Sequence, residues 1–269
     1  MADCNFSKRV FNIWPDGYRD EVLMSEVIPQ NKTSRCAMIV FPGGAYGGHA
    51  SYEGIDYAEF FADHGITSFS VDYRVTPHRY PDALYDARRA VQYVRANAEK
   101  YGIDTDKIAV IGSSAGGHLA ALLSTSSAEL ADEVSDNISK TEYMPNAQIL
   151  CYPVICNPEF SDISHKDSYK NLIGSEKSGF ECSVDPYLLM RKDTPQAFIW
   201  HTAGDDGVNV INSYRYAEHL KRNRVPVEMH IFPDGRHGLA LARDKPHVAQ
   251  WKNLVINWLS YINWVDYLE

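Results

Sequence analysis

Short runs of apolar residues alternate with longer amphipathic segments along most of the chain. Apolar runs of this kind, bounded by glycine, proline and polar residues, are typical of strands buried on both faces of a parallel sheet. We expect such strands at residues 36–41, 66–73, 108–111, 147–155, 196–201 and 225–232. Before them, residues 10–14 and 21–28 flank the turn sequence PDGYRD and are expected to pair as a hairpin.

Helical spacing of apolar residues fills several of the intervals between these strands. Residues 53–64 are expected to form one helix, and a second begins at Asp82 and ends near Gly102. A third, amphipathic helix covers residues 247–264 and closes over the sheet, with its tryptophans in the core. This alternation predicts an α/β fold with a mostly parallel central sheet, helices on both faces and right-handed crossovers.

The stretch IAVIGSSAGGHLAALLS, which begins at Ile108, places a serine where a buried strand turns into a helix. Ser114 is flanked by Gly112 and Gly116 in the pattern G-x-S-x-G, where a side chain on either glycine would collide with the facing chain. The helix that follows points its N-terminus at the serine, so the Ala115 N–H can face a developing oxyanion. A structural turn is the alternative, but the strand-turn-helix context favours a nucleophile.

A second glycine-rich stretch, PGGAYGGH, follows the predicted strand at 36–41. Its consecutive glycines, Gly43 and Gly44, allow the backbone to approach a ligand and to turn its N–H groups inward. An oxyanion hole built from main-chain donors requires this arrangement, so we assign the N–H groups of Gly43, Gly44 and Ala115 as its donors. A flexible loop without chemistry is the alternative.

An acidic pair and a histidine follow the last two predicted strands. The segment TAGDDGVNV contains Asp205 and Asp206, and the segment PDGRHG contains His237. The chain order serine, acid, histidine is the order of the catalytic triad in α/β-hydrolases. We assign Ser114 as nucleophile, His237 as general base and then acid, and Asp205 as the carboxylate that orients His237. His118, within the helix after the serine, is expected to be a packing residue.

Residues 157–195 form a polar excursion that is longer than an ordinary connection. Loops of this length in enzymes are commonly lids or binding segments, and a solvated excursion without chemical consequence is an equal alternative. The prediction is a single α/β domain covering residues 1–269, with a small lid-like insertion at approximately 157–195.

The amino-acid composition and net charge limit the classes of function that the protein is expected to have. The 269 residues are 45% hydrophobic and 23% charged, as in ordinary globular proteins. The formal net charge is −9 and no run of Lys and Arg appears, which argues against nucleic acid or an anionic membrane as partner. No apolar run is long enough to span a membrane. The expected partner is a small molecule, and a homodimer is left open.

Cysteine usage and the N-terminal sequence favour a cytoplasmic protein. The N-terminal residues lack the apolar core of a signal peptide. The five cysteines are odd in number and lack C-x-x-C spacing, which suits reduced thiols: Cys4, Cys36, Cys151, Cys156 and Cys182. No pair of histidines or carboxylates has the spacing of metal ligands, and GGAYGG is not a dinucleotide fingerprint. No metal or cofactor is expected.

Several motifs together resemble one family. FPGGAY, VDYRVTP, YGIDTDKIAVIGSSAGGHLAA, HTAGDDGVNV and IFPDGRHGLAL occur in order across most of residues 35–241. In this the chain resembles the α/β-hydrolase esterases, in the bacterial acetyl-esterase and xylan-esterase-like branch related to hormone-sensitive lipase. It departs at Pro42, where HGGG esterases have His, and at Asn209, where many hydrolases have Pro. Val208 and Asn209 follow Asp205 at the spacing of the Val and Pro that follow the family's acid, which favours Asp205 over Asp206.

The resemblance implies a serine carboxylesterase that hydrolyses short-chain acyl esters, among them acetyl esters of carbohydrates, through a triad and an acyl-enzyme. Two alternatives stay open: an arylformamidase-like amide hydrolase, and a catalytically silent α/β-hydrolase that serves as a binding protein. A peptidase of the prolyl-oligopeptidase type would carry a large additional domain, for which 269 residues leave no room.

Overall fold

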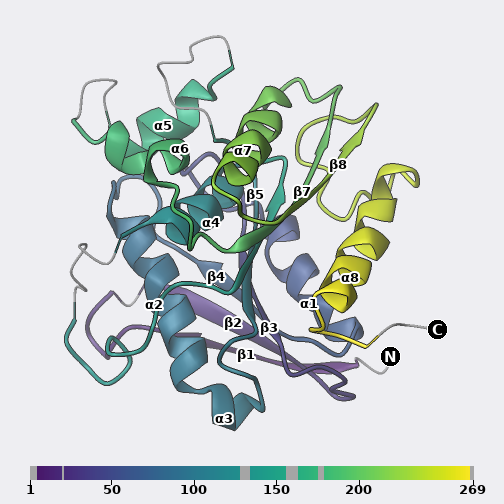
Figure 1. Ribbon diagram of the computed structural model, residues 1–269. Helices are drawn as coiled ribbons and strands as arrows, with labels where there is room; N and C mark the ends of the chain where they lie inside the picture. The colour runs from purple at the N-terminus through teal and green to yellow at the C-terminus, as the bar shows by residue number, and fades with distance from the viewer. Residues whose placement is uncertain (1–4, 20, 128–133, 156–162, 175–178, 267–269) are drawn as a thin grey trace.

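The structure is a computed structural model that describes residues 5–19, 21–127, 134–155, 163–174 and 179–266. Within these ranges eight strands form one sheet in the order β1-β2-β4-β3-β5-β6-β7-β8 (Figure 1). The pairs β1–β2 and β2–β4 are antiparallel and all other pairs are parallel. The strands are β1 (Phe6–Asn12), β2 (Leu23–Pro29), β3 (Ala37–Phe41), β4 (Thr67–Asp72), β5 (Ile108–Ser113), β6 (Ala147–Cys151), β7 (Gln196–Thr202) and β8 (Val227–Phe232).

Every strand expected from the sequence is present, so the predicted α/β-hydrolase sheet is confirmed. The largest differences in a boundary are at β1, which begins at Phe6 rather than at Val10, and at β6, which ends at Cys151 rather than at Ile155. Tyr152 has a φ of +38°, which is incompatible with extended backbone, so the chain leaves the sheet there.

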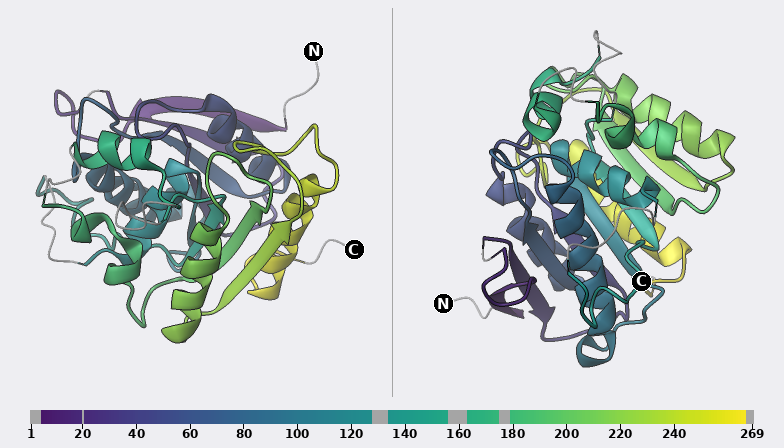
Figure 2. Two further views of the ribbon diagram at one scale, coloured as in Figure 1. Left: turned by 90° about the horizontal axis from the view of Figure 1, so that it is seen from above. Right: turned by 90° about the vertical axis from the view of Figure 1, so that its left-hand side faces the viewer.

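Helices cover both faces of the sheet (Figure 2). Helices α2, α4 and α7 pack over one face, and α1 and α8 over the other. On the second face the Trp200 and Trp251 rings stack with centroids 5.0 Å apart, which confirms that the C-terminal helix supplies core tryptophans. The helices are α1 (Ile55–Asp63), α2 (Asp82–Ala96), α3 (Ala98–Tyr101), α4 (Ala115–Thr125), α5 (Lys166–Ile173), α6 (Pro186–Leu189), α7 (Ile211–Arg222) and α8 (Trp251–Tyr261), with 3₁₀ turns at Ser51–Glu53, Cys182–Val184 and Val248–Gln250.

The described parts of the polar excursion at 157–195 contain helices that composition did not predict. Helix α5 buries three apolar side chains, Tyr169, Leu172 and Ile173, together with Ser168, and its other polar side chains are at least partly exposed. Three buried apolar residues within an otherwise polar segment are too few to stand out as a hydrophobic run in the sequence. Because they are spaced about one helical turn apart, they are still enough to give a short helix an apolar face. These parts are therefore packed against the domain core.

Candidate active site

Ser114 occupies a strained turn between β5 and α4. Its φ and ψ are 54° and −118°, outside the regions that most residues adopt. A Cβ on Gly112 would lie 2.0 Å from the Gly116 carbonyl oxygen, and a Cβ on Gly116 would lie 2.0 Å from the Phe41 carbonyl oxygen. The two glycines of the G-x-S-x-G pattern are therefore required sterically, as the sequence predicts, and the serine is lifted above the sheet.

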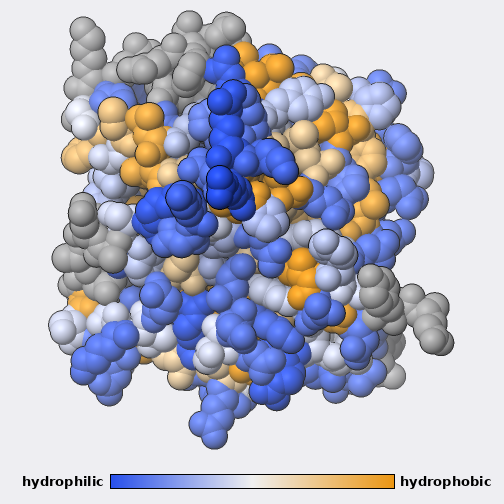
Figure 3. Space-filling view, in the orientation of Figure 1, coloured by the Kyte–Doolittle hydropathy of each residue, from blue (hydrophilic) through white to orange (hydrophobic). Residues whose placement is uncertain are grey.

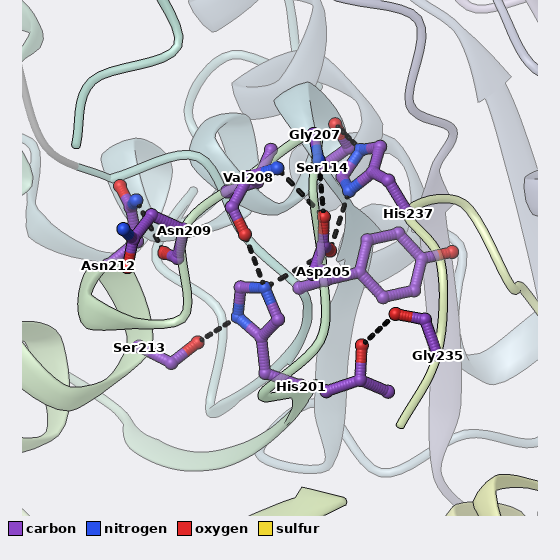
Figure 4. A network of polar contacts seen from close by, with 12 residues as sticks. Ser114, His201, Asp205, Gly207, Val208, Asn209, Asn212, Ser213, Gly235 and His237 are labelled. Atoms are coloured by element: carbon purple, nitrogen blue, oxygen red, sulfur yellow. Dashed lines mark hydrogen bonds and ion pairs between the residues drawn. The ribbon is translucent and has the colours of Figure 1, made fainter. Parts of the chain in front are cut away.

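The structure brings Ser114, His237 and Asp205 into one hydrogen-bonded series (Figure 4). His237 Nδ1 lies 2.8 Å from Asp205 Oδ2, and His237 Nε2 lies 2.8 Å from Ser114 Oγ. Because a carboxylate accepts and cannot donate, Nδ1 carries the proton and Nε2 is free to accept from the serine hydroxyl. The three residues follow β5, β7 and β8, whose carboxyl ends meet at one edge of the sheet.

The Asp205 side chain is only 1% exposed and is surrounded by donors. Its Oδ1 accepts the backbone N–H groups of Gly207 and Val208 at 2.9 and 2.8 Å. Burial alone would raise the pKa of this carboxyl, but the hydrogen bonds from His201 and His237 outweigh it and bring the pKa below its usual range. Its neighbour Asp206 is exposed, so of the two adjacent acids it is Asp205 that the structure places against His237.

The loop after β3 lies against Ser114, but one of its predicted oxyanion donors is already engaged. The Gly43 N–H donates to Glu53 Oε2 at 3.0 Å, so the structure corrects the prediction that Gly43 is a free donor. Among the described residues, no group accepts a hydrogen bond from the Gly44 N–H. Ala115 is the first residue of α4, where a helix offers its N–H no internal acceptor. Of the three predicted donors, the N–H groups of Gly44 and Ala115 are the two without an acceptor among the described residues.

Glu53 is a buried carboxyl that the sequence did not indicate. Besides Gly43, it accepts the Tyr152 hydroxyl at 2.6 Å, and that hydroxyl accepts the Ala240 N–H at 2.9 Å. Burial raises the pKa of Glu53 and that of the Tyr152 phenol. The Tyr152 ring also packs edge-on against His237, with centroids 5.1 Å apart. This network ties the loop after β3 and the loop that contains His237 to the end of β6.

The segment that contains α5 and α6 also contacts the loop after β3, residues 42–50, which we call the oxyanion loop. Asn171 Nδ2 donates to the Ala45 carbonyl at 2.9 Å. His118 Nε2 lies 2.9 Å from the Val184 carbonyl and Nδ1 lies 2.7 Å from the Tyr46 hydroxyl. Since a carbonyl only accepts, Nε2 is protonated and Nδ1 accepts from tyrosine. Burial lowers the pKa of His118 to about 4, so it is a neutral packing residue that also links the two segments.

Two of the residues missed from the sequence could have been recognised by their position. Tyr152 and His201 lie at the carboxyl ends of β6 and β7, the edge where the predicted site residues gather. Glu53 offered no such signal, because a glutamate at the start of a helix is an ordinary N-terminal residue.

Several expectations concern groups outside this site. No set of three or more His, Cys, Asp or Glu side chains among the described residues is placed to hold a metal ion. Nor does any described helix have the length and apolar character needed to cross a bilayer. Of the cysteines, Cys36, Cys151 and Cys182 are free thiols, and Cys4 and Cys156 lie outside the described residues.

The sheet order and the strand-turn-helix elbow define an α/β-hydrolase. Comparison with known proteins is more specific: the BD-FAE family model matches residues 26–220, more than half of the chain. The chain belongs to this family and lies among the α/β-hydrolase esterases related to hormone-sensitive lipase.

Individual relatives agree with this placement. The chain is similar to the solved acetyl ester-xyloside bifunctional hydrolase of Caldicellulosiruptor lactoaceticus, with a TM-score of 0.88, 33% identity, and coverage of 96% of this chain and 97% of that one. It is 34% identical to endo-1,4-beta-xylanase B of Butyrivibrio fibrisolvens over 87% of this chain and 38% of that protein. It is 29% identical to the acetylxylan esterase of Xylanibacter ruminicola over 95% of this chain and 51% of that protein. The chain therefore spans about half or less of these two curated relatives.

Proposed function

We propose that this protein is a serine carboxylesterase that acts on short-chain acyl esters, with acetyl esters of carbohydrates as its substrate class. The observation that carries the proposal is the hydrogen-bonded series Ser114, His237 and Asp205 at the carboxyl edge of the sheet. A serine hydroxyl is a weak nucleophile at neutral pH until an imidazole accepts its proton, and here an imidazole nitrogen lies at hydrogen-bond distance.

In the proposed mechanism Ser114 Oγ attacks the ester carbonyl carbon while its proton passes to His237 Nε2. Asp205 stabilises the resulting imidazolium, and the Gly44 and Ala115 N–H groups donate to the oxyanion. The bond to the alcohol then breaks, and the leaving oxygen takes the proton from His237, which leaves an acyl-enzyme. The acyl-enzyme is then hydrolysed through the same steps, with water as the nucleophile in place of Ser114. The products are the free acid, the alcohol and the regenerated enzyme.

We propose a single domain in which residues 157–195 form a lid-like insertion beside this site. Among its described residues, His165 lies within electrostatic reach of His237 and Asp205, and burial lowers its pKa. Asn171 contacts the oxyanion loop directly at Ala45, and Val184 is linked to the same loop through His118 and Tyr46. An insertion in these positions would form one wall of the substrate site.

The substrate class rests on the relatives and on the surface. The similar proteins include an acetylxylan esterase and an acetyl ester-xyloside hydrolase. On the face shown in Figure 3, hydrophobic side chains form separate groups, one of them over α5 and α6, in an otherwise hydrophilic surface. A lipase that meets an oil interface needs a continuous apolar area instead. This surface favours a soluble, polar substrate.

A series of p-nitrophenyl esters tests the acyl preference. We expect kcat/KM to be highest between acetyl and butyryl and to fall by more than about tenfold at octanoyl, because a pocket that ends early rejects each added methylene sterically. Acetylated mono- or oligosaccharides should release acetate under the same conditions. The Ser114→Ala variant is the blank for spontaneous hydrolysis.

Other outcomes of this series would change the proposal. A maximum at long acyl chains would indicate a lipase. Turnover of N-formyl or peptide substrates without any sugar deacetylation would indicate an amide hydrolase. No turnover of any substrate by a folded protein would indicate a binding protein with the same fold.

A further inference from the structure

Asp205 contacts a second imidazole besides the one on His237. His201, near the end of β7, is completely buried, and its Nε2 lies 3.2 Å from Asp205 Oδ2 and 3.0 Å from the Val208 carbonyl oxygen. Its Nδ1 lies 2.8 Å from Ser213 Oγ on α7. Figure 4 shows the ring between the acid and the start of α7, on the side of Asp205 away from Ser114.

These partners fix the protonation pattern of the His201 ring. The two groups near Nε2 are a carbonyl and a carboxylate, which only accept, so Nε2 carries a proton and donates. The remaining nitrogen, Nδ1, then accepts from the Ser213 hydroxyl. A neutral ring in this tautomer has one N–H, which the Val208 carbonyl and the Asp205 carboxylate share at 3.0 and 3.2 Å, so His201 is placed as a donor to the acid.

We propose that His201 is a positioning residue, whose Nε2–H holds Asp205 Oδ2 in the orientation that receives His237 Nδ1–H. Two backbone N–H groups, those of Gly207 and Val208, already fix Oδ1. With His201 on Oδ2 the carboxylate is held at both oxygens, and the acceptor direction that remains faces His237. The inference rests on the proposed function, because it assigns His201 a role in the same reaction.

Holding the acid in this way also sets its basicity. A donor on Oδ2 spreads the carboxylate charge, which weakens the attraction of Asp205 for the His237 imidazolium. Without that donor, the carboxylate would favour the protonated form of His237, so the acid limb of kcat/KM would move to higher pH. If the role of His201 were purely structural, its replacement would lower activity without moving the acid limb of kcat/KM.

The other titratable, charged and aromatic groups that face Asp205 and His237 are unchanged in all of these variants. His165, which precedes α5, interacts electrostatically with His237 and Asp205, and Glu53, at the end of the 3₁₀ turn Ser51–Glu53, interacts electrostatically with His237. Arg236 donates through Nη1 to the His237 carbonyl at 2.9 Å. The Tyr152 ring packs against both His201 and His237.

The test compares two amide replacements at His201. A glutamine amide reaches the place of the ring Nε2, so His201→Gln retains a donor to Asp205, whereas the amide of His201→Asn reaches only the place of Nδ1. We expect His201→Asn to lose roughly tenfold to a hundredfold in kcat on p-nitrophenyl acetate, with its acid limb raised by about half a pH unit or more. His201→Gln should retain most of the wild-type kcat and an acid limb close to that of the wild type.

Ser213→Ala is the matched control, because it removes the partner of the opposite ring nitrogen and leaves the Asp205 contact in place. Its acid limb should coincide with that of the wild type, even where thermal unfolding shows a less stable fold. Equal limbs in His201→Asn, His201→Gln and wild type would overturn the positioning role, as would a limb in Ser213→Ala that moves as far as in His201→Asn. An inactive wild type would overturn the proposed function instead, so the two failures are distinguishable.

Discussion

Replacement of Ser114 by alanine is expected to lower kcat on p-nitrophenyl acetate by about three decades or more. The substitution removes the hydroxyl that lies against His237 Nε2, and triads lose activity on this scale when the nucleophile is removed. The elbow itself should persist, since alanine has a Cβ like serine. Steady-state kinetics on protein with an unchanged thermal unfolding transition provides the measurement.

The neighbouring serine supplies a matched control. Ser113 is buried and donates to the Tyr57 hydroxyl at 3.0 Å, on the other side of the chain from the triad. Ser113→Ala should therefore lower stability slightly and leave kcat within severalfold of the wild type. Equal losses in the two variants would mean that folding is affected and not chemistry, and retained turnover in Ser114→Ala would refute the nucleophile.

Asp205→Asn is expected to have the second largest effect, with kcat lower by roughly three to four decades. Oδ1 accepts two backbone N–H groups, so an asparagine must turn its amide nitrogen toward His237. His237 Nδ1 can then only accept, its proton moves to Nε2, and the ring no longer accepts the proton of Ser114.

Asp206→Asn is the comparison that separates the two adjacent acids. Asp206 is exposed, and removing an exposed charge beside the site should change kcat by less than about threefold. The same kinetics at the pH of maximal activity compare the two variants. Greater damage in Asp206→Asn than in Asp205→Asn would show that the acid is assigned wrongly.

The sequence predicted the sheet and the three triad residues for a shared physical reason. Strands buried on both faces are continuous in apolar residues, and the edge at which parallel strands end gathers whatever polar residues follow them. Ser114, Asp205 and His237 each stand directly after such a strand or in the loop that follows it, so chain position predicted that they lie together, and the family spacing separated Asp205 from Asp206. The glycines around Ser114 were recognisable because only close backbone approach requires them.

The oxyanion loop and its supports depend on contacts that spacing does not encode. Gly43 was predicted as a donor because a glycine pair follows β3, but the direction of its N–H depends on Glu53, which folds back against it. His201 was not predicted, although it lies four residues before Asp205, because a histidine inside an apolar strand looks like a core residue. Helix α5 was not predicted because it packs through only three apolar side chains, which are too few to form a visible pattern in the sequence.

Covalent labelling tests the central claim, a serine nucleophile activated by His237, most directly. The protein is treated with an organophosphonate ester, and its intact mass and peptide masses are measured. We predict one adduct per chain, on Ser114, with loss of esterase activity in proportion to labelling and no adduct in Ser114→Ala. An adduct on another residue, or full activity after complete labelling of Ser114, would contradict the account.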